Sequence, residues 1–306
     1  MRTRGCTGSR SISTGCEMMR SLYKKSSSKP KKREVLENAE IMSVSYHDLF
    51  DFPLTFADLI RWKPTKDLSL KQSDNHVVYQ DGYFFLSKRK GLIYKRSLRE
   101  RISVKKLEIA KKASSILSKI PSVLMVAVTG SLAMENAGDD SDIDLLLITK
   151  KNTLWTTRMF SYLILKVFGF DLRKSGDKNQ KDKLCLNMWM DETDLVWKGN
   201  DRNLYTAHEI AQVLPLINKY KTYERFLYKN KWILRYWPNA VKIGGYQEEK
   251  GTRVSNNLTF SIIEAFAFRI QYQFMKSKIT REVVAPTRAI FHPQNLGKLV
   301  ISRLAS

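Results

Sequence analysis

The sequence predicts an α+β protein built around a mixed β-sheet with helices on its faces. Three observations carry this prediction. Two apolar runs, within Val123–Val128 and Asp142–Ile148, are typical of buried strands. Helical periodicity lies on either side of them, as in Ser103–Lys119. An Asp-Gly pair at Asp81-Gly82, between two β-rich runs, indicates a hairpin earlier in the chain.

Composition limits the classes of protein to consider. The chain has 306 residues, 43% of them hydrophobic, so it can bury a sizeable core in about two domains. Its 53 Lys and Arg outnumber its 30 Asp and Glu, for a net charge of +23, and a basic surface attracts polyanions such as nucleotides and nucleic acids. Three cysteines argue against a disulfide scaffold, and we expect a cytoplasmic protein. No apolar run is long enough for a transmembrane helix, so no membrane partner is expected.

Residues 1–34 are rich in Ser, Arg and Lys and poor in acids. Three interpretations stay open: a disordered basic arm, a transit-type targeting segment, or a mis-assigned start with translation beginning at Met18, Met19 or Met42. We therefore treat 1–34 as a disordered basic tail or a mis-assigned start and predict no fold for it.

Residues 35–98 are predicted to form a winged-helix-like module. Two helical segments end at Pro53 and Pro64, and the hairpin Val77–Leu86 follows them. Winged helices often place a helix in the major groove of DNA. The candidate helix Phe56–Trp62 offers only Arg61 to read bases, so packing as an accessory domain is the favoured alternative.

Residues 99–200 are predicted to be the core, and 201–306 a helical C-terminal region. The core contains the two apolar strands, a helix at about Thr153–Phe170, a Lys-rich loop at Arg173–Lys183 and a third strand at Leu184–Met190. The Lys-rich loop either grips phosphates or is simply solvated. The C-terminal region has helical segments near 206–216, 222–235 and 258–276. Within it, Thr206 and Glu209 fit the Thr-x-x-Glu pattern of a helix N-terminal capping box.

A glycine and a serine follow the first core strand, at Gly130-Ser131. Glycine allows a sharp turn and lets phosphate oxygens approach the backbone. Ser131 begins a short helical stretch, whose free N–H groups and positive dipole end suit an anion. We therefore predict that Gly130 and Ser131 bind nucleotide phosphates.

Two carboxylates open the second core strand, after ten intervening residues. Asp142 and Asp144 are two apart, so both project to one face of the strand. Desolvating two neighbouring carboxylates costs several kcal/mol each, and a divalent cation is the usual compensation. Oxygen ligands suit Mg²⁺. We predict that Asp142 and Asp144 hold one or two Mg²⁺ ions that bridge the phosphates of a nucleoside triphosphate and promote displacement at its α-phosphorus. The alternative is a polar turn with an end-capping Asp.

This pattern resembles that of the nucleotidyltransferase superfamily typified by DNA polymerase β. The motif, an apolar strand followed by Gly-Ser and then Asp-x-Asp, covers about 125–150, and the implied βαβαβ core covers about 104–195. The body more loosely resembles uncharacterised bacterial nucleotidyltransferase domain-containing proteins. That resemblance rests on the segments Tyr46–Pro53, Leu184–Asp191, Tyr205–Glu209 and Phe291–Pro293.

The superfamily often has a third carboxylate on a later strand, which ligates metal or takes the proton of the attacking hydroxyl. By alternation, Cys185, Asn187, Trp189 and Asp191 share one face of the third strand. Asn187 cannot act as a base, which leaves Asp191 as the candidate catalytic residue. The alternative is that Asp191 is a turn residue, in which case the protein binds nucleotide yet catalyses poorly.

The resemblance implies a Mg²⁺-dependent transferase that moves a nucleoside monophosphate from a triphosphate to an acceptor hydroxyl and releases pyrophosphate. The acceptor stays open among a small molecule, a protein side chain and an RNA end. The competing hypothesis is a nucleic-acid-binding protein that uses the winged-helix-like module and has an inactive transferase core. It predicts salt-dependent DNA binding that survives loss of Asp142 and Asp144.

Overall fold

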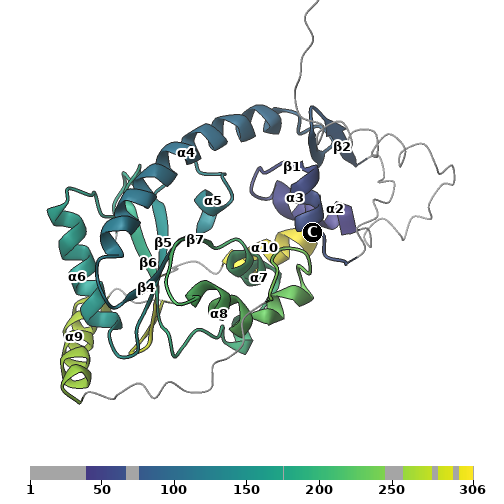
Figure 1. The fold of residues 1–306 in the computed structure, drawn as a ribbon. Coiled ribbons are helices and arrows are strands. Elements are labelled where there is room, and N and C mark those ends of the chain that lie inside the picture. The colour runs from purple at the N-terminus through teal and green to yellow at the C-terminus, as the bar shows by residue number, and fades with distance from the viewer. Residues whose placement is uncertain are drawn as a thin grey trace, which may run out of the picture.

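The computed structural model describes residues 39–66, 76–174, 176–244, 258–277, 282–291 and 296–305. Its centre is a six-stranded mixed sheet with the order β7-β4-β5-β6-β9-β8 (Figure 1). β5 and β6 are parallel, whereas the other neighbours are antiparallel. The strands are β4 (Val123–Val128), β5 (Ile143–Thr149), β6 (Leu184–Asp191), β7 (Leu214–Asn218), β8 (Val283–Ala285) and β9 (Arg288–Ile290). The predicted mixed sheet flanked by helices is confirmed.

Helices cover both faces of this sheet. One face packs with α4 (Gly91–Leu117), α6 (Leu154–Val167) and α9 (Leu258–Lys276). The other face packs with α7 (Leu204–Ala211), α8 (Thr222–Lys229) and the 3₁₀ helix η2 (Lys231–Arg235), and with the N-terminal elements. Successive residues of β4 and β5 therefore pack into opposite cores. Val126 and Leu147 pack on the face covered by α4, α6 and α9, whereas Ala127 and Leu146 pack on the face covered by α7 and α8. Burial on both faces explains why these strands are continuously apolar.

The N-terminal elements form a small three-stranded antiparallel sheet, in the order β1-β3-β2, with two helices. They are α2 (Ala39–Asp48), β1 (Leu54–Thr55), α3 (Phe56–Arg61), β2 (Val77–Gln80) and β3 (Tyr83–Leu86). Asp81 and Gly82 both have positive φ (52° and 90°), as the predicted hairpin turn requires. These elements alone do not establish a winged helix, so the winged-helix assignment stays a prediction. α4 runs without a break across the expected domain boundary at 98/99.

The C-terminal region departs from the helical prediction, because β7, β8 and β9 join the central sheet. All three are short, and such segments carry too few residues to display the alternation of a strand. β7 contains Pro215, which an edge strand tolerates since one of its sides needs no partner. The remaining elements are η1 (Gly199–Asp201) and α10 (Leu296–Ala305). The tail 1–34 and His292-Pro293 lie outside the described residues, and no helix within the described ranges is long and apolar enough to cross a membrane.

A buried histidine pair joins the N-terminal elements to α7. His47 Nε2 and His208 Nε2 are 3.1 Å apart, and His47 Nδ1 donates to the Ser43 carbonyl oxygen (2.8 Å). The His208 ring stacks on Trp62, with centroids 3.9 Å apart. Burial lowers the pKa of His47 to about 4 and also lowers that of His208, so both rings are neutral near pH 7.

The pair predicts acid-sensitive stability. Because the folded-state pKa of His47 lies below the unfolded value of 6.5, the unfolded chain takes up protons first as the pH falls. Stability is therefore full above pH 6.5 and falls toward pH 4, by about 2–3 kcal/mol at pH 4.5 from His47 alone. Urea midpoints of wild type and of His47→Gln/His208→Gln, measured from pH 7 to 4.5, should show a shallower pH slope in the variant. His76→Gln is the matched control at an exposed site; equal slopes for all three proteins would contradict the assignment.

Candidate active site

The glycine-serine turn lies between β4 and the short helix α5 (Gly130–Ala133). Gly130 has φ +62°, and a Cβ at this position would lie 2.9 Å from Asp144 Oδ2. Glycine is therefore required both by the backbone conformation and by the closeness of Asp144. Thr129 N donates to the Asp144 carbonyl oxygen (3.1 Å), which fixes the turn to β5. Ser131 lies exposed in the first turn of α5, and Thr129 forms no side-chain cap there.

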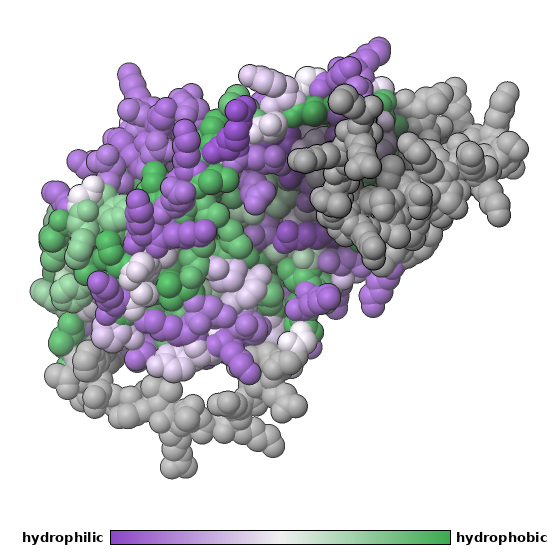
Figure 2. Space-filling model, turned by 45° about the horizontal axis from the view of Figure 1, so that its top comes forward, coloured by the Kyte–Doolittle hydropathy of each residue, from purple (hydrophilic) through white to green (hydrophobic). Residues whose placement is uncertain are grey.

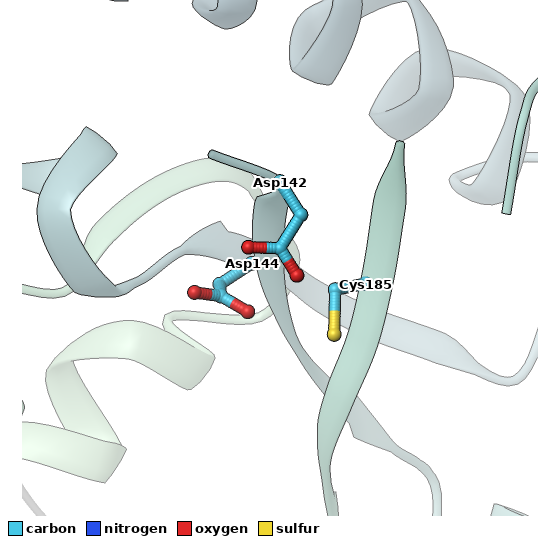
Figure 3. A group of neighbouring side chains, drawn as sticks. All are labelled: Asp142, Asp144 and Cys185. Atoms are coloured by element: carbon cyan, nitrogen blue, oxygen red, sulfur yellow. The ribbon is translucent and has the colours of Figure 1, made fainter. Parts of the chain in front are cut away.

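Asp142 and Asp144 lie together, as their spacing predicts. One carboxylate oxygen of each and Cys185 Sγ all lie within 4.8 Å of one another (Figure 3). Cys185 comes from β6, whose parallel register places it opposite Asp144. Figure 3 shows the two carboxylates and the thiol facing a common space. The cluster could hold a metal ion.

Negative charge exceeds positive charge in the cluster, because two carboxylates face one arginine. Burial, and then the neighbouring Asp142 carboxylate, raises the pKa of Asp144 to about 7. Asn187 Nδ2 donates to Asp144 Oδ1 (2.6 Å). Arg173 Nη1 donates to Asp142 Oδ2 (2.6 Å) and is the cation of the Lys-rich loop that reaches the pair. In the same loop, Lys181 pairs with Asp139 and Lys183 with Asp177.

Residues 109–189 match the family model of the nucleotidyltransferase domain. This chain carries a nucleotidyltransferase domain. The match confirms the resemblance to the DNA polymerase β-like superfamily, and it includes the glycine-serine turn and the three residues of the cluster. A search of curated proteins gave no match.

The donor atoms of the nucleotidyltransferase domain fit a hard divalent cation in part. The Asp142 and Asp144 carboxylates are the oxygen ligands that such ions prefer, with further positions left for substrate phosphates. Burial raises the pKa of the Cys185 thiol, so the sulfur is protonated and is a poor ligand for a hard ion. The fitting ligands are thus the two carboxylates.

Lys106 holds the loop that presents Asp142. Its buried ammonium donates to the carbonyl oxygens of Asp139 (3.1 Å) and Ser141 (2.7 Å) and pairs with Asp182 (2.7 Å). Lys106 lies on α4 and looks in the sequence like one of many lysines on a polar helix face. Its role could not be found from pattern, because the partners are backbone carbonyls distant in the chain.

The structure does not bring Asp191 to the cluster. Asp191 pairs with Thr149 at one end of the β5–β6 ladder, whereas Cys185 pairs with Asp144 near the other. The Asp191 carboxylate accepts hydrogen bonds from Asn152 N (2.7 Å), Thr193 N (2.8 Å) and Thr193 Oγ1 (2.6 Å). These contacts are those of the alternative interpretation, a residue that fixes a turn.

A different carboxylate approaches the domain, from α7. Sequence pattern pairs Thr206 with Glu209 as a capping box, but α7 begins at Leu204, and the box is formed by Asn203 and Thr206. Glu209 therefore takes no part in the capping box and lies within the helix. Burial, and then the charge of Asp144, raises the pKa of Glu209 to about 8.

A cavity of about 460 Å³ lies beside the cluster, on the sheet face that α7 and α8 cover. Its lining includes Thr129, next to Gly130, together with Tyr205 and Glu209 from α7. The Asp144 charge also contributes to the raised pKa of Tyr205, so both α7 residues are within electrostatic reach of the carboxylate pair. We call this space the Glu209 cavity.

Proposed function

We propose that the protein is a Mg²⁺-dependent nucleotidyltransferase that moves a nucleoside monophosphate from a nucleoside triphosphate to an acceptor hydroxyl. The observation that carries the proposal is the facing pair Asp142 and Asp144, next to the Gly130 turn and within the matched domain. The two carboxylates lie together, and one arginine, Arg173, pairs with Asp142. A divalent ion would balance the remaining negative charge.

In this proposal Asp142 and Asp144 hold the metal, and Gly130 and Ser131 cradle the β- and γ-phosphates. When bound, Mg²⁺ supplies charge neutralisation at the phosphates and the departing pyrophosphate. Asn187 orients the Asp144 carboxylate through its amide N–H (2.6 Å). Arg173 brings a fixed positive charge to the same place, where it favours the approach of a polyanionic donor.

A nucleic-acid-binding role is the competing function, and one surface feature favours it. Exposed basic side chains follow α4, where Figure 2 shows hydrophilic side chains gathered at the top of the view. They are Arg101, Lys105, Lys111 and Lys112. Such a row supplies phosphate contacts that carry no base specificity.

Calorimetric titration with each of the four ribonucleoside triphosphates, with and without Mg²⁺, tests the proposal. Wild type should bind one or more of them in a Mg²⁺-dependent manner, and Asp142→Asn/Asp144→Asn should not bind. Lack of binding by folded wild type would overturn the transferase proposal. Salt-dependent binding of duplex DNA that is equal in wild type and the double variant would then support the competing function.

A further inference from the structure

The Glu209 cavity is formed where many elements of the fold converge. Thr129 and Met188 come from the central sheet and its β4–α5 turn, and Phe226 comes from α8. Loop residues near η1 and the start of α10 complete the lining. A volume of about 460 Å³ falls within the range typical of small-molecule sites, about 300–1,000 Å³.

Three polar side chains in the cavity wall have hydrogen-bonding capacity to spare. Thr129 is buried, and its hydroxyl has no partner among the described residues. Arg288 is buried as well, and its Nε lacks a partner within that same part of the chain. Among the described residues, the Glu209 carboxylate accepts a side-chain hydrogen bond from Gln212 Nε2 (2.7 Å). Unsatisfied buried groups of this kind are expected where a ligand supplies the missing partners.

Apolar side chains form the buried part of the remaining wall, whereas Lys198, Asn200, Asp201 and Lys298 belong to its polar part. Met188, Ile210, Val213, Phe226 and Ile290 line the cavity, and all of them are buried. Apolar walls with a few converging polar groups are typical of sites for compact organic molecules.

The cavity also lies at the right place for an acceptor. Thr129 immediately precedes Gly130, and its backbone N–H is bonded to the Asp144 carbonyl oxygen (3.1 Å). The cavity wall and the strand that carries Asp144 are therefore in direct contact at Thr129. Glu209 lies outside the matched residues 109–189, so the family match assigns it no role.

Resting on the proposed function, we propose that the Glu209 cavity is the acceptor subsite, that the acceptor is a small organic molecule bearing a hydroxyl group, and that Glu209 accepts the hydrogen bond of that hydroxyl. In the transfer, the hydroxyl oxygen forms a bond to the α-phosphorus of the triphosphate. The bond from that phosphorus to the oxygen bridging to the β-phosphate breaks, and pyrophosphate leaves with the electron pair. The hydroxyl proton passes to the Glu209 carboxylate in its ionised form, which predominates above about pH 8, and then to solvent. In this proposal Glu209 on α7 supplies the third carboxylate, in place of Asp191 on β6.

The test follows label from α-³²P-labelled nucleoside triphosphate and Mg²⁺ into three separate fractions: ultrafiltered small metabolites, total protein and total RNA. Wild type should label a small metabolite. Glu209→Gln should slow this labelling by at least about 100-fold, the range of general acid–base catalysis. It should leave the calorimetric Kd for the triphosphate unchanged, and Glu209→Asp should recover part of the rate.

Asp191→Asn is the matched control, since it removes a buried carboxylate from the other end of β6. It should label at the wild-type rate. Label in protein or RNA, wild-type labelling by Glu209→Gln, or no labelling by wild type that binds the triphosphate would each overturn the inference and leave the nucleotide site standing. If folded wild type binds no triphosphate at all, the proposed function itself is contradicted.

Discussion

Asp144→Asn is expected to abolish nucleotidyl transfer and, at pH 8 without divalent ions, to make the folded protein more stable. Transfer should fall by at least about 1,000-fold, because the change removes one of the two carboxylates proposed to hold the metal where charge develops. Stability should rise because a neutral amide replaces a carboxylate that burial and Asp142 disfavour in its charged form. An ordinary structural residue would not give these opposite effects.

The pH dependence gives the sign of the stability change. The pKa of Asp144 is about 7 in the folded chain against 3.8 ordinarily, so the folded chain keeps a proton that the unfolded chain loses between those values. Wild-type stability therefore falls as the pH rises from about 4 to 7, and that loss is absent in Asp144→Asn. Three pKa units correspond to about 4 kcal/mol. We expect about 1–2 kcal/mol, because the Asp144 side chain is only partly buried.

Urea unfolding of both proteins at pH 5 and pH 8, in the presence of a chelator, measures this difference. The Asp144→Asn midpoint should exceed that of wild type at pH 8, and the gap should narrow at pH 5. Added Mg²⁺ should raise the wild-type midpoint alone. A variant that is less stable than wild type at pH 8 would show that Asp144 serves the fold rather than the site.

Gly130→Ala is the second change with a large expected effect. The added Cβ would lie 2.9 Å from Asp144 Oδ2, so the carboxylate must shift away from its place beside Asp142. Displacement of a reacting or metal-binding group by about 1 Å costs about 100-fold in rate. We therefore expect transfer to fall by about 100-fold, with Mg²⁺-dependent triphosphate binding weakened as well.

Gly169→Ala separates this effect from backbone strain. Gly169 also has positive φ (+78°), but its added Cβ would meet no atom within 4 Å. Both variants should lose about 1–2 kcal/mol of stability from the left-handed backbone conformation. Only Gly130→Ala should lose transfer activity. Equal activity of the two variants, measured at the same folded fraction, would rule out the Gly130–Asp144 contact as a functional constraint.

Much of the site could be predicted from sequence because its parts are local. Gly130, Ser131, Asp142 and Asp144 occupy one contiguous stretch, and the period of two along a strand is enough to place both carboxylates on one side. The buried strands could also be predicted, since continuous apolar runs of this length are typical of buried strands and are shorter than most helices. The coarse fold, a mixed sheet with helices on both faces, follows from these elements.

Asp191 shows where alternation along a single strand stops being informative. Alternation places Cys185, Asn187, Trp189 and Asp191 on one face, but the β5–β6 pairing shifts register between Asp144 and Leu146. After the shift, Trp189 packs with Leu147 on the opposite face, whereas Met188 and Met190 pack with Leu146 and Ile148. The sequence of one strand shows neither the shift in register nor which residue of the neighbouring strand each of its residues pairs with.

The sequence by itself determined the Gly130-Ser131 turn, the carboxylate pair and the strands that carry them, because strand period and glycine stereochemistry act between residues close in the chain. Tertiary structure alone decided the partners of that pair. Arg173, Asn187 and Lys106 reach the Asp142–Asp144 region through strand register and helix packing. Glu209 lines the cavity from within α7, which begins at Leu204 with Asn203 rather than Thr206 as its N-cap. These contacts join residues far apart in the chain, and their geometry is set only when the whole core has packed.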